Sequence, residues 1–138
     1  MLNNTWQREQ AISICKETWM DITLLCLKSQ DMPSLVAVLN PKLEAYAKFQ
    51  LPGLAKTLGS KPFLFGDQPV AADFYLADFL EKVAAMDAKL DIHTKLVKGN
   101  STWEGYLARF FALPKIKEFR ASDKYIERPF NSPSAKWY

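Results

Sequence analysis

Histidine, cysteine and glycine are all scarce in this chain of 138 residues, which holds one His, two Cys and five Gly. No imidazoles or thiols stand at the spacing of zinc or haem ligands, so we predict no metal site. The glycines lie apart from one another, and the sequence has neither a P-loop nor a dinucleotide-binding fingerprint. The motifs that normally accompany phosphate chemistry are therefore missing.

Long apolar runs are absent as well. No window approaches ~18 uninterrupted apolar residues, and the first ten residues lack the charged start and apolar stretch of a secretory signal. We therefore expect no membrane span and a soluble, cytoplasmic protein. Hydrophobic residues nevertheless make up 49% of the chain and aromatic residues 13%, which excludes intrinsic disorder and favours one core and one domain over residues 1–138.

Neither sign of charge is concentrated along the sequence. The formal net charge is +3, from 18 basic and 15 acidic residues. The excess of cations lies near the C-terminus, where Lys117, Arg120 and Lys124 alternate with Glu118 and Asp123. A nucleic-acid interface needs cations gathered on one face, so we expect no nucleic-acid partner.

The two cysteines, Cys15 and Cys26, are too far apart to form a disulfide with each other. On one helix their separation corresponds to roughly 16 Å along the axis. We expect both to be reduced residues that pack in the core.

Apolar residues recur in steps of three and four along most of the chain, which predicts an all-α bundle. The expected helices span residues 5–29, 41–58, 71–90, from 101 to about 111, and 115–122. The second is expected to begin at Asn40-Pro41 and to bend near residues 48–52, because Pro52 removes a backbone donor. The helix at 71–90 is the most apolar and should lie at the centre, with residues 1–4 a linker remnant and 123–138 an irregular tail.

Three polar residues match the requirements of helix capping. Asp73 stands in the first turn of the 71–90 helix, where a carboxylate accepts backbone N–H bonds. Asp73 and Asp78 could instead be paired catalytic carboxylates, but a spacing of five does not share a helix face, so we favour capping. Ser101 and Glu104 have the S-x-x-E spacing of a capping box. His93 could belong to a hydrolytic triad, but no serine elbow accompanies it, and an exposed loop position is the simpler interpretation.

Several motifs resemble the C-terminal helical domain of cytosolic glutathione transferases. Lys61-Pro-Phe-Leu-Phe-Gly-Asp67, followed by Ala72-Asp-Phe74, is similar to the loop and helix start of that domain. Leu107-Ala-Arg-Phe110, Leu113-Pro-Lys-Ile116 and Arg128-Pro-Phe…Ala135-Lys-Trp137 are similar to the mu class in particular. The resemblance implies a five-helix domain with the 71–90 helix at its centre. It also implies a Ser or Thr cap where this chain has Val70, so this helix start should be weaker than the family's.

The same resemblance bears on chemistry. In these transferases an N-terminal thioredoxin-like domain binds glutathione and supplies the Tyr or Ser hydroxyl that activates its thiol. No βαβ pattern precedes Thr5 in this sequence. We therefore expect no catalytic residue and no cofactor in this chain, with glutathione bound only if a thioredoxin-like domain is supplied.

Three functions fit these observations. The leading hypothesis is a non-catalytic protein-interaction or scaffold module, in which a protein partner or a second copy covers the apolar surface that a thioredoxin-like domain would otherwise cover. The alternative is the helical half of a mu-like transferase, in which Tyr106, Trp137, Cys26 and Leu27 would form the wall of a hydrophobic substrate site. The third is passive binding of apolar ligands.

Overall fold

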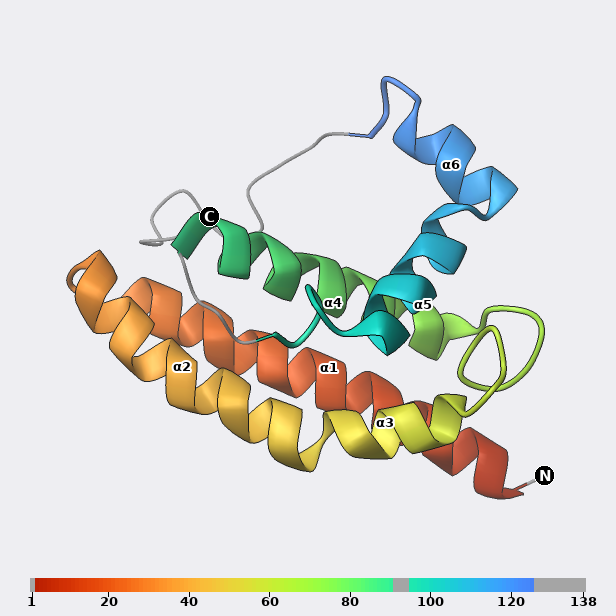
Figure 1. Ribbon diagram of the computed structural model, residues 1–138, viewed down its shortest axis with the longest axis horizontal. Helices are drawn as coiled ribbons and strands as arrows, with labels where there is room; N and C mark the ends of the chain where they lie inside the picture. Colours follow the sequence, from red (N-terminus) through yellow and green to blue (C-terminus); the bar gives the residue numbers. More distant parts are fainter. Residues whose placement is uncertain (1, 91–94, 126–138) are drawn as a thin grey trace.

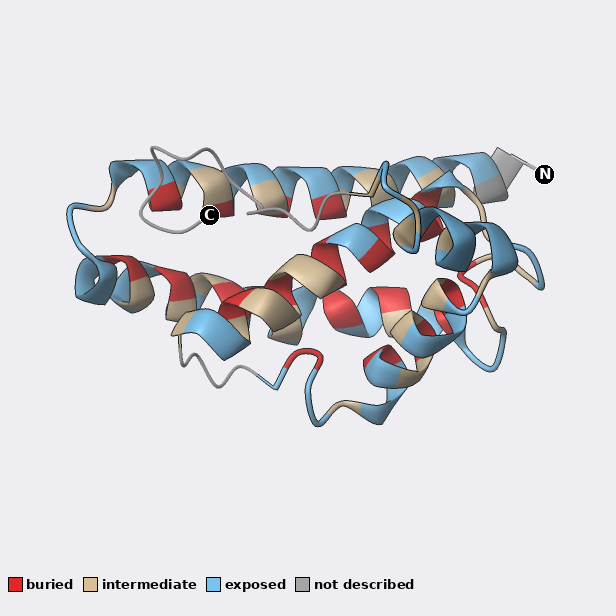
Figure 2. Ribbon diagram, turned by 90° about the horizontal axis from the view of Figure 1, so that it is seen from above, coloured by how far each residue is buried: buried red, intermediate tan, exposed pale blue. Residues whose placement is uncertain are grey.

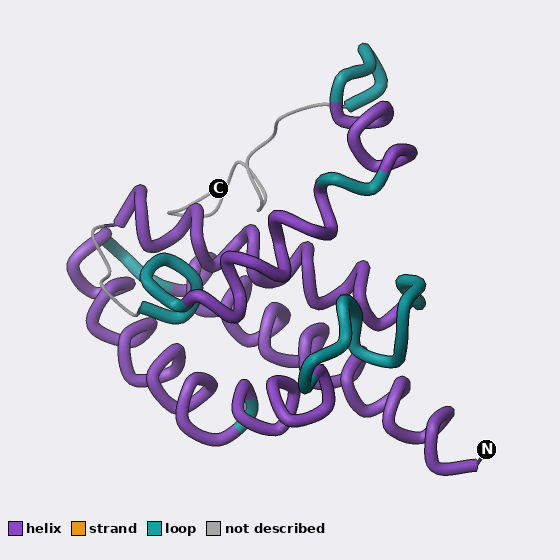
Figure 3. Tube along the Cα trace, turned by 45° about the vertical axis from the view of Figure 1, so that its right-hand side comes forward, coloured by secondary structure: helices purple, strands orange, loops and turns teal. Residues whose placement is uncertain are grey.

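The computed structural model describes residues 2–90 and 95–125, and within these ranges the chain is a bundle of α-helices with no strand (Figures 1 and 3). Its helices are α1 (Leu2–Lys28), α2 (Met32–Phe49), α3 (Leu51–Leu58), α4 (Ala71–Leu90), α5 (Ser101–Phe111) and α6 (Pro114–Arg120). The all-α prediction is confirmed. His93, Trp137 and most of the expected tail lie outside the described residues. No helix within them is long and apolar enough to cross a bilayer.

The long helix α1 packs most extensively against α4 and also contacts α2. Its 27 residues correspond to about 40 Å. Ala11, Cys15, Ile22 and Cys26 recur along one side of it and are buried, which is why red segments line its inner face in Figure 2. The backbone at residues 2–4, expected as a linker remnant, is already part of this helix.

Helix α2 begins earlier than the sequence pattern indicates. Asp31 is its N-cap, and the Asp31 carboxylate accepts a 2.8 Å hydrogen bond from the backbone N–H of Ser34. Pro33 falls in the first turn, where the missing N–H has no cost. The expected start at Asn40-Pro41 is therefore wrong. Pro41 lies inside the helix at an exposed position, where water can solvate the carbonyl that loses its partner.

The bend expected at residues 48–52 is a break at Gln50, which ends α2 and begins α3. The single helix expected at 41–58 is thus two helices, and Pro52 stands in the first turn of the second. The side-chain oxygen of Gln50 accepts a 3.3 Å hydrogen bond from the hydroxyl of Thr18, which ties the break to α1. Gly59 then ends α3 with φ +56°, a conformation that costs a glycine little.

Helix α4 is the centre of the bundle, between α1 and α5 (Figure 1). Its buried side chains come from nearly every turn and are mostly apolar. Those residues are Ala72, Asp73, Leu76, Ala77, Phe79, Leu80, Val83 and Met86. Phe74 and Tyr75, outside this buried set, remain 46% and 41% exposed.

The cap of α5 lies one residue before the expected one. Asn100 is the N-cap, and its side-chain oxygen is 3.5 Å from the N–H of Trp103. Ser101 is the first residue of the helix, so it is not the cap. Glu104 does reach back, but to the backbone N–H of Gly99, at 2.9 Å. Asn100 thus caps the helix as Ser would, while Glu104 reaches one residue beyond the cap, so the two bonds do not have the reciprocal spacing of a capping box.

Helix α6 has no buried residue and extends away from the other helices in Figure 1. Arg120 holds it in place. The Arg120 guanidinium lies 4.3 Å from the ring centroid of Phe111 and 4.9 Å from that of Tyr125. The same side chain donates a 2.8 Å hydrogen bond to the Glu81 carboxylate on α4.

Candidate functional site

The most fully bonded polar group of the interior is the carboxylate of Asp73, which is completely buried. One oxygen accepts hydrogen bonds from the backbone N–H of Leu64 and from the hydroxyl of Tyr106, both at 2.9 Å. The other accepts from the backbone N–H of Val70, also at 2.9 Å. We call this group of four residues the Asp73 junction. It joins the loop after α3, the start of α4 and the middle of α5.

Val70 precedes α4 where the resemblance implies a Ser or Thr cap. A Ser or Thr side chain at this position would accept a hydrogen bond from the backbone N–H of Asp73. Here that N–H donates instead to the backbone carbonyl of Val70, at 2.9 Å. The reverse bond, from the Val70 N–H to the Asp73 carboxylate, is present. Of the two bonds of the reciprocal capping motif, the one accepted by the Asp73 side chain is present, and a backbone carbonyl replaces the missing Ser or Thr side chain in the other.

Tyr106 is fully buried, and its hydroxyl donates to Asp73. Burial raises the pKa of this phenol, and the negative charge of Asp73 raises it further. The phenol therefore stays protonated near neutral pH, which suits a hydrogen-bond donor and not a base. Sequence reasoning missed this bond because nothing local links two residues on different helices.

Neither cysteine is poised to act as a nucleophile. Burial raises the pKa of Cys15 to about 12, partly opposed by the Tyr46 hydroxyl beside it, and raises the pKa of Cys26 to about 11. A thiol is reactive as the thiolate, which these values make rare at neutral pH. Both thiols are free, as predicted. No group of three or more His, Cys, Asp or Glu in the described part of the chain could hold a metal ion.

Three of the residues expected to form the wall of a hydrophobic substrate site, Cys26, Leu27 and Tyr106, lie within the described structure. Cys26 is buried near the end of α1, and its neighbour Leu27 is 44% exposed on the outer side of that helix. Tyr106 lies on α5 with its hydroxyl on Asp73. Trp137 lies outside the described residues, so whether these four form a wall stays a prediction.

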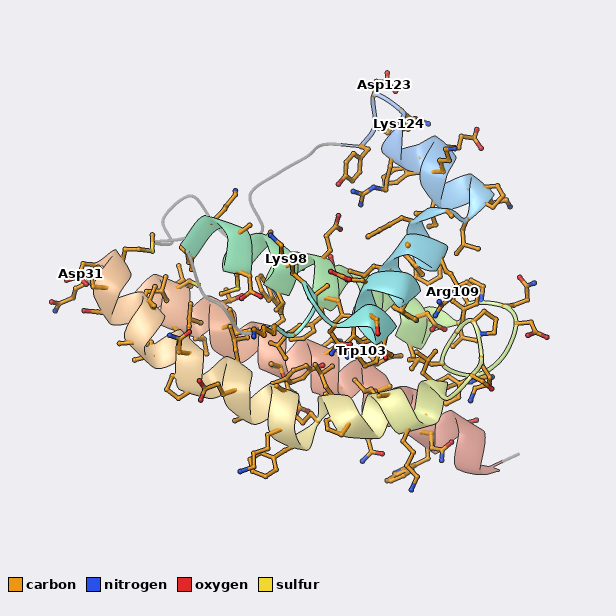
Figure 4. All side chains as sticks on the ribbon, viewed as in Figure 1. Asp31, Lys98, Trp103, Arg109, Asp123 and Lys124 are labelled. Carbon is orange, nitrogen blue, oxygen red and sulfur yellow. The ribbon has the colours of Figure 1, made fainter. Side chains whose placement is uncertain are left out.

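Two cavities lie on either side of the start of α5. One, of about 240 Å³, has an apolar lining that includes Ala47, Leu51 and Trp103. The other, of about 390 Å³, has a mixed lining that includes Leu58 and Pro62 together with Lys61, Thr102 and Arg109. Figure 4 shows Trp103 beneath α5 and Arg109 beside the loop that follows α3. Neither of these cavities is lined by residues of α1 or α4.

The outer side of α1 carries a row of large apolar side chains. Trp6 and Met20 are 63% and 60% exposed, and Leu24 and Leu27 are 41% and 44% exposed. At 100° per residue these four positions fall within one narrow sector, opposite the buried stripe of the same helix. We call these four residues the α1 outer row.

Comparison with known proteins identifies the family to which this helical bundle belongs. A sequence profile of the family "Glutathione S-transferase, C-terminal domain" matches residues 37–123, which is more than half of the chain. The chain belongs to this family. Three of its relatives are named mu-class transferases. Glutathione S-transferase Mu 1 of Mus musculus is 28% identical over 125 residues, and that of Rattus norvegicus 27% over 122.

The third relative, Glutathione S-transferase Mu 7 of Mus musculus, is 31% identical over 93 residues, covering 64% of this chain and 39% of its own length. The two Mu 1 matches cover 88% and 86% of this chain but 50% and 49% of the relatives. This chain thus spans about half the length of the relatives it matches. The resemblance read from the sequence motifs is confirmed: the chain has a glutathione transferase C-terminal helical domain similar to the mu class.

Proposed function

We propose that this glutathione transferase-like helical domain is a non-catalytic interaction module, and that the α1 outer row is the surface that binds its protein partner. The supporting observation is the alignment of Trp6, Met20, Leu24 and Leu27 on one exposed helix face. Single exposed apolar residues are ordinary, but an aligned set of large ones marks an interaction surface. From Trp6 to Leu27 the row extends about 30 Å.

The polar residues that stand between Trp6 and Met20 on this side of α1 do not cover the apolar side chains of the α1 outer row. Ser13 and Glu17 lie in the same sector of α1 and bond to each other, with 2.6 Å between the Ser13 hydroxyl and the Glu17 carboxylate. Leu24 and Leu27 follow Met20 at steps of four and three, which is the spacing by which a helix enters an apolar groove. The partner that fits is therefore a protein surface with an apolar groove or a second apolar helix face.

The chemistry of the described residues agrees with a non-catalytic role. The two thiols are held protonated by burial, and the Tyr106 hydroxyl donates to Asp73. None of these groups is both exposed and ionised near neutral pH, as an activated nucleophile must be. On this proposal glutathione binds only when a thioredoxin-like domain is supplied, and the module acts in the cytoplasm.

The first partner to test is a second copy of the chain. The α1 outer row of that copy is itself an apolar helix face, so the two rows could pack against each other. Sedimentation equilibrium should show a dimer for the wild-type chain and a monomer for Leu24→Lys. Ala45→Lys, which adds the same charge at an exposed position of α2, is the matched control and should stay dimeric. Equal behaviour of all three proteins would count against the α1 outer row as an interface between copies.

A second candidate, the helical half of a mu-like transferase, is favoured by the extent of the match to the named relatives. In this function Cys26, Leu27, Tyr106 and Trp137 would line the site for a hydrophobic electrophile. The test is to join the chain to a mu-type thioredoxin-like domain and measure conjugation of glutathione to a chlorinated nitrobenzene. Activity that falls with Leu27→Ala through a higher KM would support this candidate, and an inactive, folded fusion would argue against it.

A further inference from the structure

The larger of the two cavities has the features of an anion site. It measures about 390 Å³ and lies between the loop after α3 and the first turn of α5. Its volume is within the range of small-molecule sites, roughly 300–1,000 Å³. Two cations, Lys61 and Arg109, line it together with the hydroxyl-bearing residues Ser60, Ser101 and Thr102. No acidic residue is among its lining residues.

Arg109 is held in one orientation by its surroundings. Its Nε donates a 3.3 Å hydrogen bond to the backbone carbonyl of Pro62. Its Nη1 lies only 3.3 Å from the place where a Cβ on Gly105 would stand. The guanidinium therefore packs against the helix surface that Gly105, which has no side chain, leaves open. Long side chains on a helix lean toward its N-terminus, which brings this group toward Thr102. Figure 4 shows Arg109 on this side of α5.

The terminal amino groups of Arg109 remain available to a ligand. Within the described residues, the bond to Pro62 is the one hydrogen bond that this side chain makes, and no carboxylate pairs with it. The nearest acid along α5, Glu104, is roughly 140° around the helix from Arg109. The Glu104 carboxylate is also bonded to the N–H of Gly99. The positive charge in the cavity is thus not neutralised by α5.

Lys61, in the loop after α3, supplies the second charge among the lining residues. Its Nζ donates a 2.5 Å hydrogen bond to the carbonyl of Thr57 in α3. An ammonium group has three donors, so two remain. Ser101 and Thr102 are exposed at the first two positions of α5, which adds hydroxyl donors beside the guanidinium.

We propose that this cavity, the Arg109 pocket, binds a small phosphate-bearing molecule. A guanidinium presents a planar pair of donors that matches two phosphate oxygens, whereas an ammonium acts as a point charge. An arginine that no carboxylate pairs with among the described residues, in a cavity also lined by a lysine and hydroxyl-bearing side chains, is suited to a doubly charged tetrahedral anion. The pocket is lined by α3, α5 and the loop between α3 and α4, so it is independent of the α1 outer row.

The test is a titration of the intact chain with inorganic phosphate, followed by two-dimensional NMR of its amides. The amides of Ser101 and Thr102 and the Nε–H of Arg109 should shift and saturate. Sodium chloride at matched ionic strength should leave them unchanged. Arg109→Gln should weaken phosphate binding at least tenfold. Lys115→Gln, which removes an equal charge from an exposed position of α6, should change it less than twofold.

A second variant separates binding from folding. Gly105→Ala keeps the charge and favours the helix, yet its methyl group would stand 3.3 Å from the present place of Nη1, so the guanidinium must shift away from it. It should retain the wild-type unfolding midpoint or exceed it, and bind phosphate several-fold more weakly. The proposal is overturned if chloride reproduces the phosphate shifts, if Arg109→Gln binds as wild type, or if Lys115→Gln loses as much affinity as Arg109→Gln.

Discussion

The start of α4 and helix α6 are each joined to the rest of the bundle through one polar side chain. The side chain is a buried carboxylate at α4 and a partly exposed guanidinium at α6. At the Asp73 junction a buried carboxylate accepts three hydrogen bonds, two from buried groups and one from the partly buried N–H of Val70. At α6, Arg120 lies between two rings and pairs with Glu81, and both charged side chains are about a third exposed.

This difference sets the cost of removing a bonding partner from each region. Donors at the Asp73 junction are buried or only partly exposed, so a donor that loses the carboxylate is poorly solvated and its desolvation is not repaid. Donors and acceptors left at α6 can be solvated, so their loss is compensated in part. Similar polar attachments thus have unequal effects on the free energy of unfolding.

The largest effect is expected from Asp73→Ala. It leaves the backbone N–H groups of Leu64 and Val70 without an acceptor, and the Tyr106 hydroxyl keeps only the backbone carbonyl of residue 73, 3.3 Å away. At about 1–3 kcal/mol for each lost bond, we expect a loss of ~3 kcal/mol. Urea unfolding measures it. Asp78→Ala on the same helix is the control, because that carboxylate is exposed and pairs with Lys82, and it should cost below ~0.5 kcal/mol. Equal losses in the two variants would remove the distinction between the regions.

Tyr106→Phe should have the next largest effect. It removes one donor to Asp73 while the two backbone donors remain, so about 1.5 kcal/mol is expected for a bond to a charged group. Tyr75→Phe, at a residue 41% exposed, should be close to neutral in the same unfolding experiment. A neutral Tyr106→Phe would show that the hydroxyl adds nothing to the Asp73 junction.

The cap of α5 is an intermediate case, because Asn100 is only partly buried. Asn100→Ala should cost about 1 kcal/mol, the usual value for an N-cap, whereas Ser101→Ala should be close to neutral. Thermal unfolding of the two variants decides between the residues. A larger loss for Ser101→Ala would restore the cap expected from the S-x-x-E spacing.

The smallest effect is expected from Arg120→Met. The free energy of global unfolding should fall by about 0.5 kcal/mol, because the lost contacts are partly exposed. Hydrogen exchange should nevertheless accelerate at the amides of α6 and remain unchanged in α4. Lys117→Met on the same helix is the control. Faster exchange throughout α4 would mean that α6 supports the core.

The sequence was sufficient where a local pattern determines structure. Cys15, Ile22 and Cys26 recur at helical spacing, and the structure buries all three. Asp73 meets Val70 three residues earlier, a bond that lies within one turn. The break near Pro52 likewise arises from a missing backbone donor.

The prediction from the sequence was wrong where a residue is compatible with two positions in a helix, and the sequence contained no information on contacts between distant residues. Pro41 suggested a helix start, but an exposed proline inside a helix is also permitted when packing favours the helix. Asn100 was a readable signal, since asparagine caps as well as serine does. The Tyr106 bond to Asp73 and the Arg109 bond to Pro62 span 33 and 47 residues, so only the folded chain brings them together.

Isothermal titration of glutathione into the purified chain tests most directly the claim that this helical domain performs no glutathione chemistry by itself. We predict no saturable heat, because no described side chain supplies an activated nucleophile or a site for the tripeptide thiol. Saturable binding, together with conjugation of glutathione to a chlorinated nitrobenzene by the same preparation, would contradict this prediction.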